Sequence, residues 1–151
     1  MIKALSLAAA TLLAASTAHA HSHKVKQLEI VHPWCIETED TTKPVVVSMT
    51  IKNAGGRPDR LLRASTLEAA KAELRAGVPP DAEGDVIPAI AVDGRGEVNL
   101  KRGGPHVLLT GMKRTLGAYD GFLMTLTFAR AGKVDVELMV EERSILAPAR
   151  H

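Results

Sequence analysis

The feature that most constrains the fold is the segment from Gly96 to Leu116, in which two short strand-like stretches flank a Gly-Gly-Pro corner. Apolar residues alternate in 98–100 and again in 107–109, and a period of two predicts strands with one buried face. The corner at 103–105 breaks the chain between them. His106 follows this corner, at the rim of the expected sheet, where binding groups are often presented. The segment predicts two strands and makes His106 either a candidate ligand or a hydrogen-bonded rim residue.

Short stretches of the same kind recur along the chain, separated by glycine, proline and polar turns. Residues 44–51 are rich in β-branched side chains and form the strongest predicted strand. Pro33 is expected to end the first strand or to place it at an edge. Residues 67–76 suit either a helix or a strand. The regular spacing predicts an all-β fold, an antiparallel β-sandwich. The other expected strands are 25–31, 59–65, 86–92, 98–100, the stretch after His106, 122–128 and 134–140.

The first twenty residues are typical of a secretory signal peptide. They hold one lysine, an apolar run rich in Ala and Leu, and small residues around His19. A membrane anchor is the alternative, but the uncharged stretch is short for a span. We therefore predict cleavage after Ala20, a periplasmic or otherwise exported protein without a stable membrane span, one domain over 21–140, and a loose tail over 141–151.

Charge and cysteine content exclude several classes of protein. The formal net charge is only +2, which argues against a nucleic-acid partner. Cys35 is the single cysteine, so no internal disulfide can form. We expect Cys35 to be a small buried hydrophobe, with an exposed thiol as the alternative. No paired carboxylates, nucleophile elbow or phosphate-binding loop stands out, and we predict that the protein is not an enzyme.

Cleavage after Ala20 would expose a terminus that reads His21-Ser22-His23-Lys24. The free amine, two amide nitrogens and the His23 imidazole can form a square-planar set that suits divalent copper or nickel. Alternatively, His21 clamps copper through its own amine and ring nitrogen, with His23 or another histidine completing the site. A polar tail without metal is the third possibility.

Three stretches of the chain, in the right order, resemble the PCu(A)C family of periplasmic copper chaperones. They are Met49 to Leu62, Val98 to Lys113, and Leu126 to Val136. The resemblance implies a cupredoxin-like, Greek-key sandwich that carries monovalent copper on surface histidines and methionines. It also implies delivery of copper to an accepting envelope protein, such as a cytochrome oxidase assembly factor or subunit.

The ligand set that the resemblance implies is mostly missing. The family pair His-x-Met reads His106-Val107-Leu108 here, and no His or Met occurs between Ile51 and Pro105. The upstream histidine should fall near Glu73 to Arg75. Monovalent copper prefers thioether sulfur, which leucine does not offer. Met112 is a candidate replacement, with a core position as the alternative.

Two hypotheses follow. In the first, the protein is a divergent copper chaperone whose site has moved to His21 and His23, either alone or with His106, a nitrogen-rich set that favours divalent copper. Met112 belongs instead to a rebuilt site for monovalent copper at His106. In the second, it is a metal-free adaptor of the same fold in envelope copper handling. Met49, Met124 and Met139 are assigned to packing, and His32 to a structural role.

Overall fold

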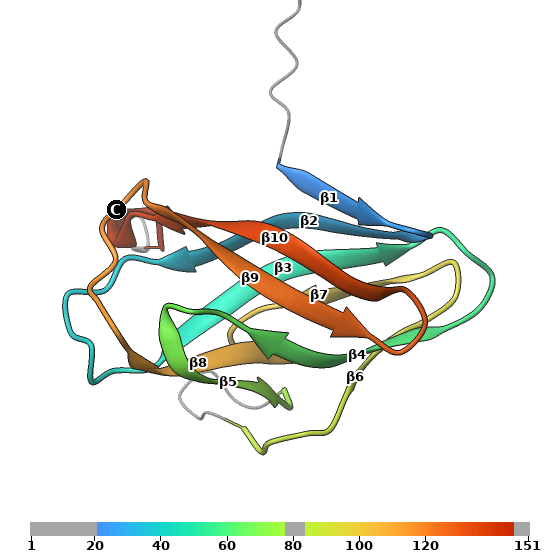
Figure 1. Cartoon of the computed structure of the whole chain (residues 1–151), viewed down its shortest axis with the longest axis horizontal. Helices are drawn as coiled ribbons and strands as arrows, with labels where there is room; N and C mark the ends of the chain where they lie inside the picture. Colours follow the sequence, from blue (N-terminus) through green and yellow to red (C-terminus); the bar gives the residue numbers. More distant parts are fainter. Residues whose placement is uncertain (1–20, 78–83, 147–151) are drawn as a thin grey trace, which may run out of the picture.

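The computed structural model describes residues 21–77 and 84–146 (Figure 1). This part of the chain consists of strands and one short 3₁₀ helix. In chain order they are β1 (Ser22–Val25), β2 (Leu28–Ile36), β3 (Val45–Asn53), β4 (Asp59–Ser65), β5 (Ala69–Arg75), β6 (Ile90–Val92), β7 (Glu97–Leu100), β8 (His106–Met112), β9 (Gly121–Phe128), β10 (Gly132–Glu141) and η1 (Arg143–Leu146).

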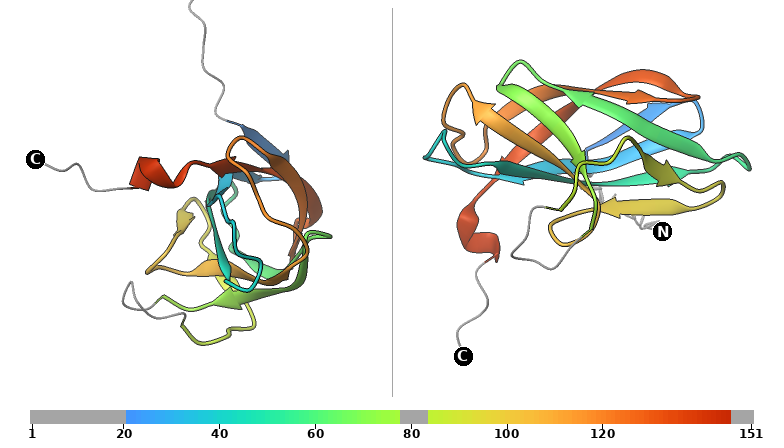
Figure 2. Two further views of the ribbon diagram at one scale, coloured as in Figure 1. Left: turned by 90° about the vertical axis from the view of Figure 1, so that its left-hand side faces the viewer. Right: turned by 90° about the horizontal axis from the view of Figure 1, so that it is seen from below.

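The strands hydrogen-bond in the order β5-β8-β3-β2-β10-β9-β4-β6, with β1 added to β2 and β7 added to β3. The sheet curves until its two ends face each other, as the end-on view in Figure 2 shows. This confirms the predicted β-sandwich. One pairing departs from the antiparallel expectation, because β10 runs parallel to β2.

Alternation along the strands explains which face each one buries. In β9, Phe122, Met124 and Leu126 are buried, whereas Leu123 between them is 64% exposed. The segment that the sequence left open between helix and strand is β5, antiparallel to β8. Its helix-forming composition is overridden because Ala69 and Leu74 reach the core only from a paired strand.

The N-terminal region differs from the single strand expected over 25–31. It forms a hairpin, in which β1 pairs with β2 and Lys26 adopts a positive φ of 50° at the turn. Pro33 does not end β2. The register shifts between Val31 and Trp34, and this bulge accommodates a proline inside the strand. Residues 22–25 therefore form a strand of the sheet and not a polar tail.

The tail expected over 141–151 begins later than expected. Glu141 is the last residue of β10, and the backbone N–H of Arg143 donates to the Glu37 carboxylate at 3.1 Å. These contacts tie Glu141 and Arg143 to the sandwich, which therefore extends beyond the expected boundary at residue 140. Residues 1–20, where a signal peptide is expected, and residues 147–151 lie outside the described residues. Within 21–77 and 84–146, no helix is long and apolar enough to cross a membrane.

Candidate metal centre

His106 lies at the start of β8 but is buried, with 2% of its surface exposed. Its Nδ1 lies 2.9 Å from the carbonyl oxygen of Gly104. Because a carbonyl can only accept, Nδ1 carries the proton and donates, and Nε2 keeps the lone pair. The corner before β8 thus folds back onto the histidine and fixes its ring. This geometry agrees with the second interpretation of His106, a histidine held by a hydrogen bond.

Two charged residues of β5 lie opposite His106 and Leu108, the positions of the family's His-x-Met pair. Arg75 stands directly across from His106, and Glu73 directly across from Leu108. Opposed residues in an antiparallel pair share a face, so these four side chains lie together. The register agrees with the place where the resemblance puts the missing histidine.

Arg75 is fixed there by two strong contacts. Its guanidinium donates to Glu73 at 3.0 Å and to the Gly84 carbonyl at 2.8 Å. The two side chains are only 16% and 17% exposed. A guanidinium is a permanent cation without a lone pair, so it cannot ligate copper and it repels a metal ion beside it. The face where the resemblance places copper holds an ion pair in this chain.

Met112 does not join His106. The two residues stand at opposite ends of β8, which at about 3.3 Å per residue puts them about 20 Å apart. Met112 is 6% exposed and belongs to the hydrophobic core. Of the methionines assigned to packing, Met49 and Met124 are buried, whereas Met139 lies outside the core, beside Trp34 on the neighbouring strand.

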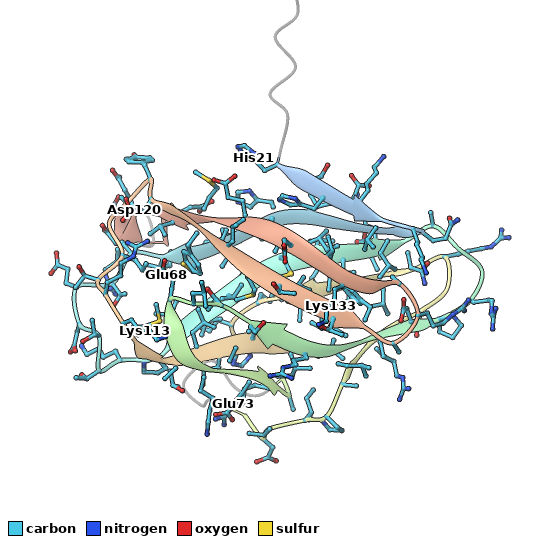
Figure 3. All side chains as sticks on the ribbon, viewed as in Figure 1. His21, Glu68, Glu73, Lys113, Asp120 and Lys133 are labelled. Carbon is cyan, nitrogen blue, oxygen red and sulfur yellow. The ribbon has the colours of Figure 1, made fainter. Side chains whose placement is uncertain are left out.

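His21 and His23 stand at the other side of the molecule. Figure 3 shows His21 at the start of β1, and Glu73 far from it on β5. Side chains two residues apart in a strand share a face, so His21 and His23 are brought together. His23 Nε2 accepts a hydrogen bond from the Glu137 backbone N–H at 3.2 Å. Strands β2 and β3 separate β1 from β8, so His106 is not part of this pair.

The side chains of the described residues contain no group of three or more His, Cys, Asp or Glu placed to hold a metal ion. The amine that cleavage after Ala20 would create is a further donor that only the processed chain has. Sequence reasoning missed one neighbour of His21. His32 Nε2 lies 2.7 Å from the Glu141 carboxylate, and the only signal in the sequence is a histidine immediately before Pro33.

Cys35 fulfils the expectation of a small buried hydrophobe. It is fully buried in β2. Burial, together with the nearby negative charge of Glu141, raises the pKa of its thiol to about 12. A neutral thiol in the core is not available to a metal ion or to intermolecular pairing in the folded protein.

Residues 28–140 match the sequence profile of the LpqE-like lipoproteins. The chain belongs to the LpqE-like family. The match spans β2 to β10, which is the whole sandwich apart from β1. A search of curated proteins found no match.

Several solved structures share this LpqE-like fold. The apo PCuAC domain from PmoF1 is 24% identical, with a TM-score of 0.73, and the alignment covers 81% of this chain and 99% of that one. The copper-bound PCuAC domain from PmoF2 gives 24% identity, a TM-score of 0.72, and coverage of 81% and 98%. The Cu(I) form of DR1885 from Deinococcus radiodurans gives 24% identity, 0.65, and 86% and 87%. These matches confirm the resemblance to PCu(A)C domains and the fold that it implied.

Proposed function

We propose that this LpqE-like protein is an exported copper-binding protein with a chaperone-like role, and that its copper site lies at His21 and His23. The observation that carries the proposal is the difference between two places in the molecule, the face beside His106 and the N-terminal histidines. An Arg75–Glu73 ion pair occupies the face beside His106, while His23 of β1 and His21 just before it lie on one side of the chain at a terminus that cleavage would free. Nitrogen donors of this kind suit divalent copper.

The pairing of β1 favours the clamp over the square-planar alternative. The His32 backbone N–H donates to the His21 carbonyl at 2.9 Å. Hydrogen bonds alternate along an antiparallel ladder, so the next one joins the His23 N–H to the Ile30 carbonyl. The square-planar set needs the His23 amide nitrogen as a deprotonated ligand, which would break that bond. A clamp by the His21 amine and ring, completed by an imidazole, leaves the hairpin intact.

His21 is also placed for transfer of its cargo. Its side chain is exposed, and β1 adds to the outside of the sandwich (Figure 1). A recipient can therefore contribute its own ligands before the first ones leave. The proposed recipient is a copper-accepting envelope protein, such as a cytochrome oxidase assembly factor or subunit. Binding and transfer, rather than catalysis, are the roles that these residues support.

The test is a titration of the protein that begins at His21, with competing chelators, against divalent copper and, under reduction, monovalent copper. We expect one divalent ion per chain, at least about tenfold weaker binding in His23→Ala, and no change in His106→Ala. Tight monovalent binding that His106→Ala abolishes would move the site back to β8.

The half-buried ion pair at Arg75 also supports the second hypothesis, a metal-free adaptor of the same fold in envelope copper handling. On that account the protein offers a surface to copper-handling partners and carries no ion. It is supported by absence of stoichiometric copper on the correctly processed chain, and a tight equimolar copper complex rejects it.

A further inference from the structure

His32 lies where two strands meet along one edge of β2. One edge of β2 is taken by β3, and β1 and β10 share the other, β1 beside residues 28–31 and β10 beside residues 34–36. The bulge at His32 fills the gap between the two partners. Segments from both ends of the chain therefore converge on this histidine.

The ring of His32 is held with one nitrogen open. Its Nε2 lies 2.7 Å from Oε1 of Glu141, and an ionised carboxylate can only accept, so Nε2 carries the proton. Nδ1 then has the lone pair. A carboxylate that accepts from one ring nitrogen while the other faces a metal is the usual arrangement around metal-bound histidines. The Trp34 ring, with its centroid 6.2 Å from that of His32 and tilted by 32°, flanks the imidazole.

His21 is the residue directly opposite. The His32 N–H donates to the His21 carbonyl at 2.9 Å, and residues in such a pair have Cα atoms about 5.5 Å apart. The His21 amine and ring therefore start within one side-chain length of the His32 ring. His23 Nε2 accepts from the Glu137 N–H at 3.2 Å, an exposed hydrogen bond that copper replaces when it binds this ring.

The backbone at His32 is strained. Its φ is 48°, in the left-handed region that is unfavourable for a residue with a side chain. The side chain nevertheless remains 46% exposed, so burial of the ring does not offset this cost. Strain of this kind is often found at ligand-binding positions.

From these contacts we infer that His32 is a third copper-binding histidine, which completes the His21 clamp through Nδ1, and that Glu141 is its positioning residue. The inference rests on the proposed function, because it adds ligands to the same site. The ligand is a divalent copper ion held by the amine and ring of His21 and the ring of His32, with the His23 ring of the proposed site as a further donor.

The experiment compares variants of the protein that begins at His21, titrated with Cu²⁺ and examined by electron paramagnetic resonance. His32→Asn is chosen because asparagine tolerates a positive φ and has no imidazole. Glu141→Ala removes the acceptor, and Glu141→Gln restores a neutral one. Glu97→Gln, an exposed residue of β7, is the matched control, and circular dichroism checks that each variant is folded.

We expect His32→Asn to lose one coupled nitrogen from the spectrum and to bind Cu²⁺ at least about tenfold more weakly. Loss of an orienting carboxylate typically weakens metal binding by about 10- to 100-fold, so we expect that range for Glu141→Ala and partial recovery in Glu141→Gln. Unchanged affinity and spectrum in folded His32→Asn, with copper still bound, would overturn the role of His32 and leave the proposed function standing. Absence of Cu²⁺ binding in the unsubstituted protein would instead reject the proposed function, and this inference with it.

Discussion

Replacing Arg75 with histidine and Leu108 with methionine is expected to create a monovalent-copper site beside His106. Arg75 faces His106 across the β5–β8 ladder, and Cβ atoms of opposed residues lie about 4.5–5.5 Å apart. Position 108 lies two residues along the same face. The double variant therefore gathers two imidazoles and one thioether, which are donors that monovalent copper accepts.

The cost in stability can be worked out from the contacts that are lost. Arg75 gives up hydrogen bonds of 2.8 and 3.0 Å, each worth about 1.5–3 kcal/mol when one partner is charged. Together they amount to about 3–6 kcal/mol. Partial exposure favours the lower end, so we expect a loss of about 3–4 kcal/mol. Leucine to methionine conserves volume and adds less than about 1.5 kcal/mol. The free energy of unfolding of a typical domain is about 5–15 kcal/mol, so the variant should fold.

The assay is urea unfolding together with competition for monovalent copper under reduction. The matched control is Arg75→Leu, which removes the same cation without adding a ligand. We expect both proteins to lose similar stability, but only the double variant to gain monovalent copper, by at least about 100-fold over the control. Equal copper affinity in the two folded proteins would refute the reasoning that the ion pair occupies the family site.

Three further predictions concern the scaffold. Cys35 should resist thiol reagents at pH 8 until the protein unfolds. Its neutral thiol contributes stability that is fully present below the ordinary pKa of 9.0 and is lost as pH rises toward about 12, and alkaline unfolding curves should show this decline. Gly111→Ala should lower the free energy of unfolding by about 1–3 kcal/mol in urea, because φ is +65° and a Cβ would lie 2.8 Å from that of Ala70; an unchanged midpoint would contradict this. Asp59→Ala should lower the free energy of unfolding by about 2–5 kcal/mol, because the Asp59 carboxylate accepts from the Arg130 and Ala131 N–H groups at 2.9 and 3.0 Å. The control is Asp135→Asn at an exposed position, which should lower it by less than about 1 kcal/mol.

Strands whose apolar alternation is local were predictable from the sequence. The expected strand at 59–65 coincides with β4, and the expected strands at 122–128 and 134–140 fall within the hairpin of β9 and β10. Residues 69–75 were not assigned, because their composition suits a helix and only the pairing with β8 makes them a strand. The bulge at His32 was missed for the same reason. It depends on which strands share the edge of β2.

Some residues of the candidate site were also predictable from local sequence patterns, and others were not. A histidine pair at 21 and 23 is visible as a local pattern, and so is the loss of methionine at 108. The position of Arg75 opposite His106 is a matter of register between distant strands, which no local pattern encodes. The contact between His32 and Glu141 joins positions far apart in the chain through the parallel pairing of β2 and β10. Residues that act together across such pairings appear only in the folded structure.

The most direct test of the central claim is the stoichiometry of Cu²⁺ on the protein that begins at His21, measured with the terminal amine free and with it acetylated. The proposed site uses that amine, so we predict one tightly bound ion with nitrogen ligation on the free terminus and its loss on the acetylated one. Equal binding by the two forms, or binding by neither, would contradict a copper site at the N-terminus.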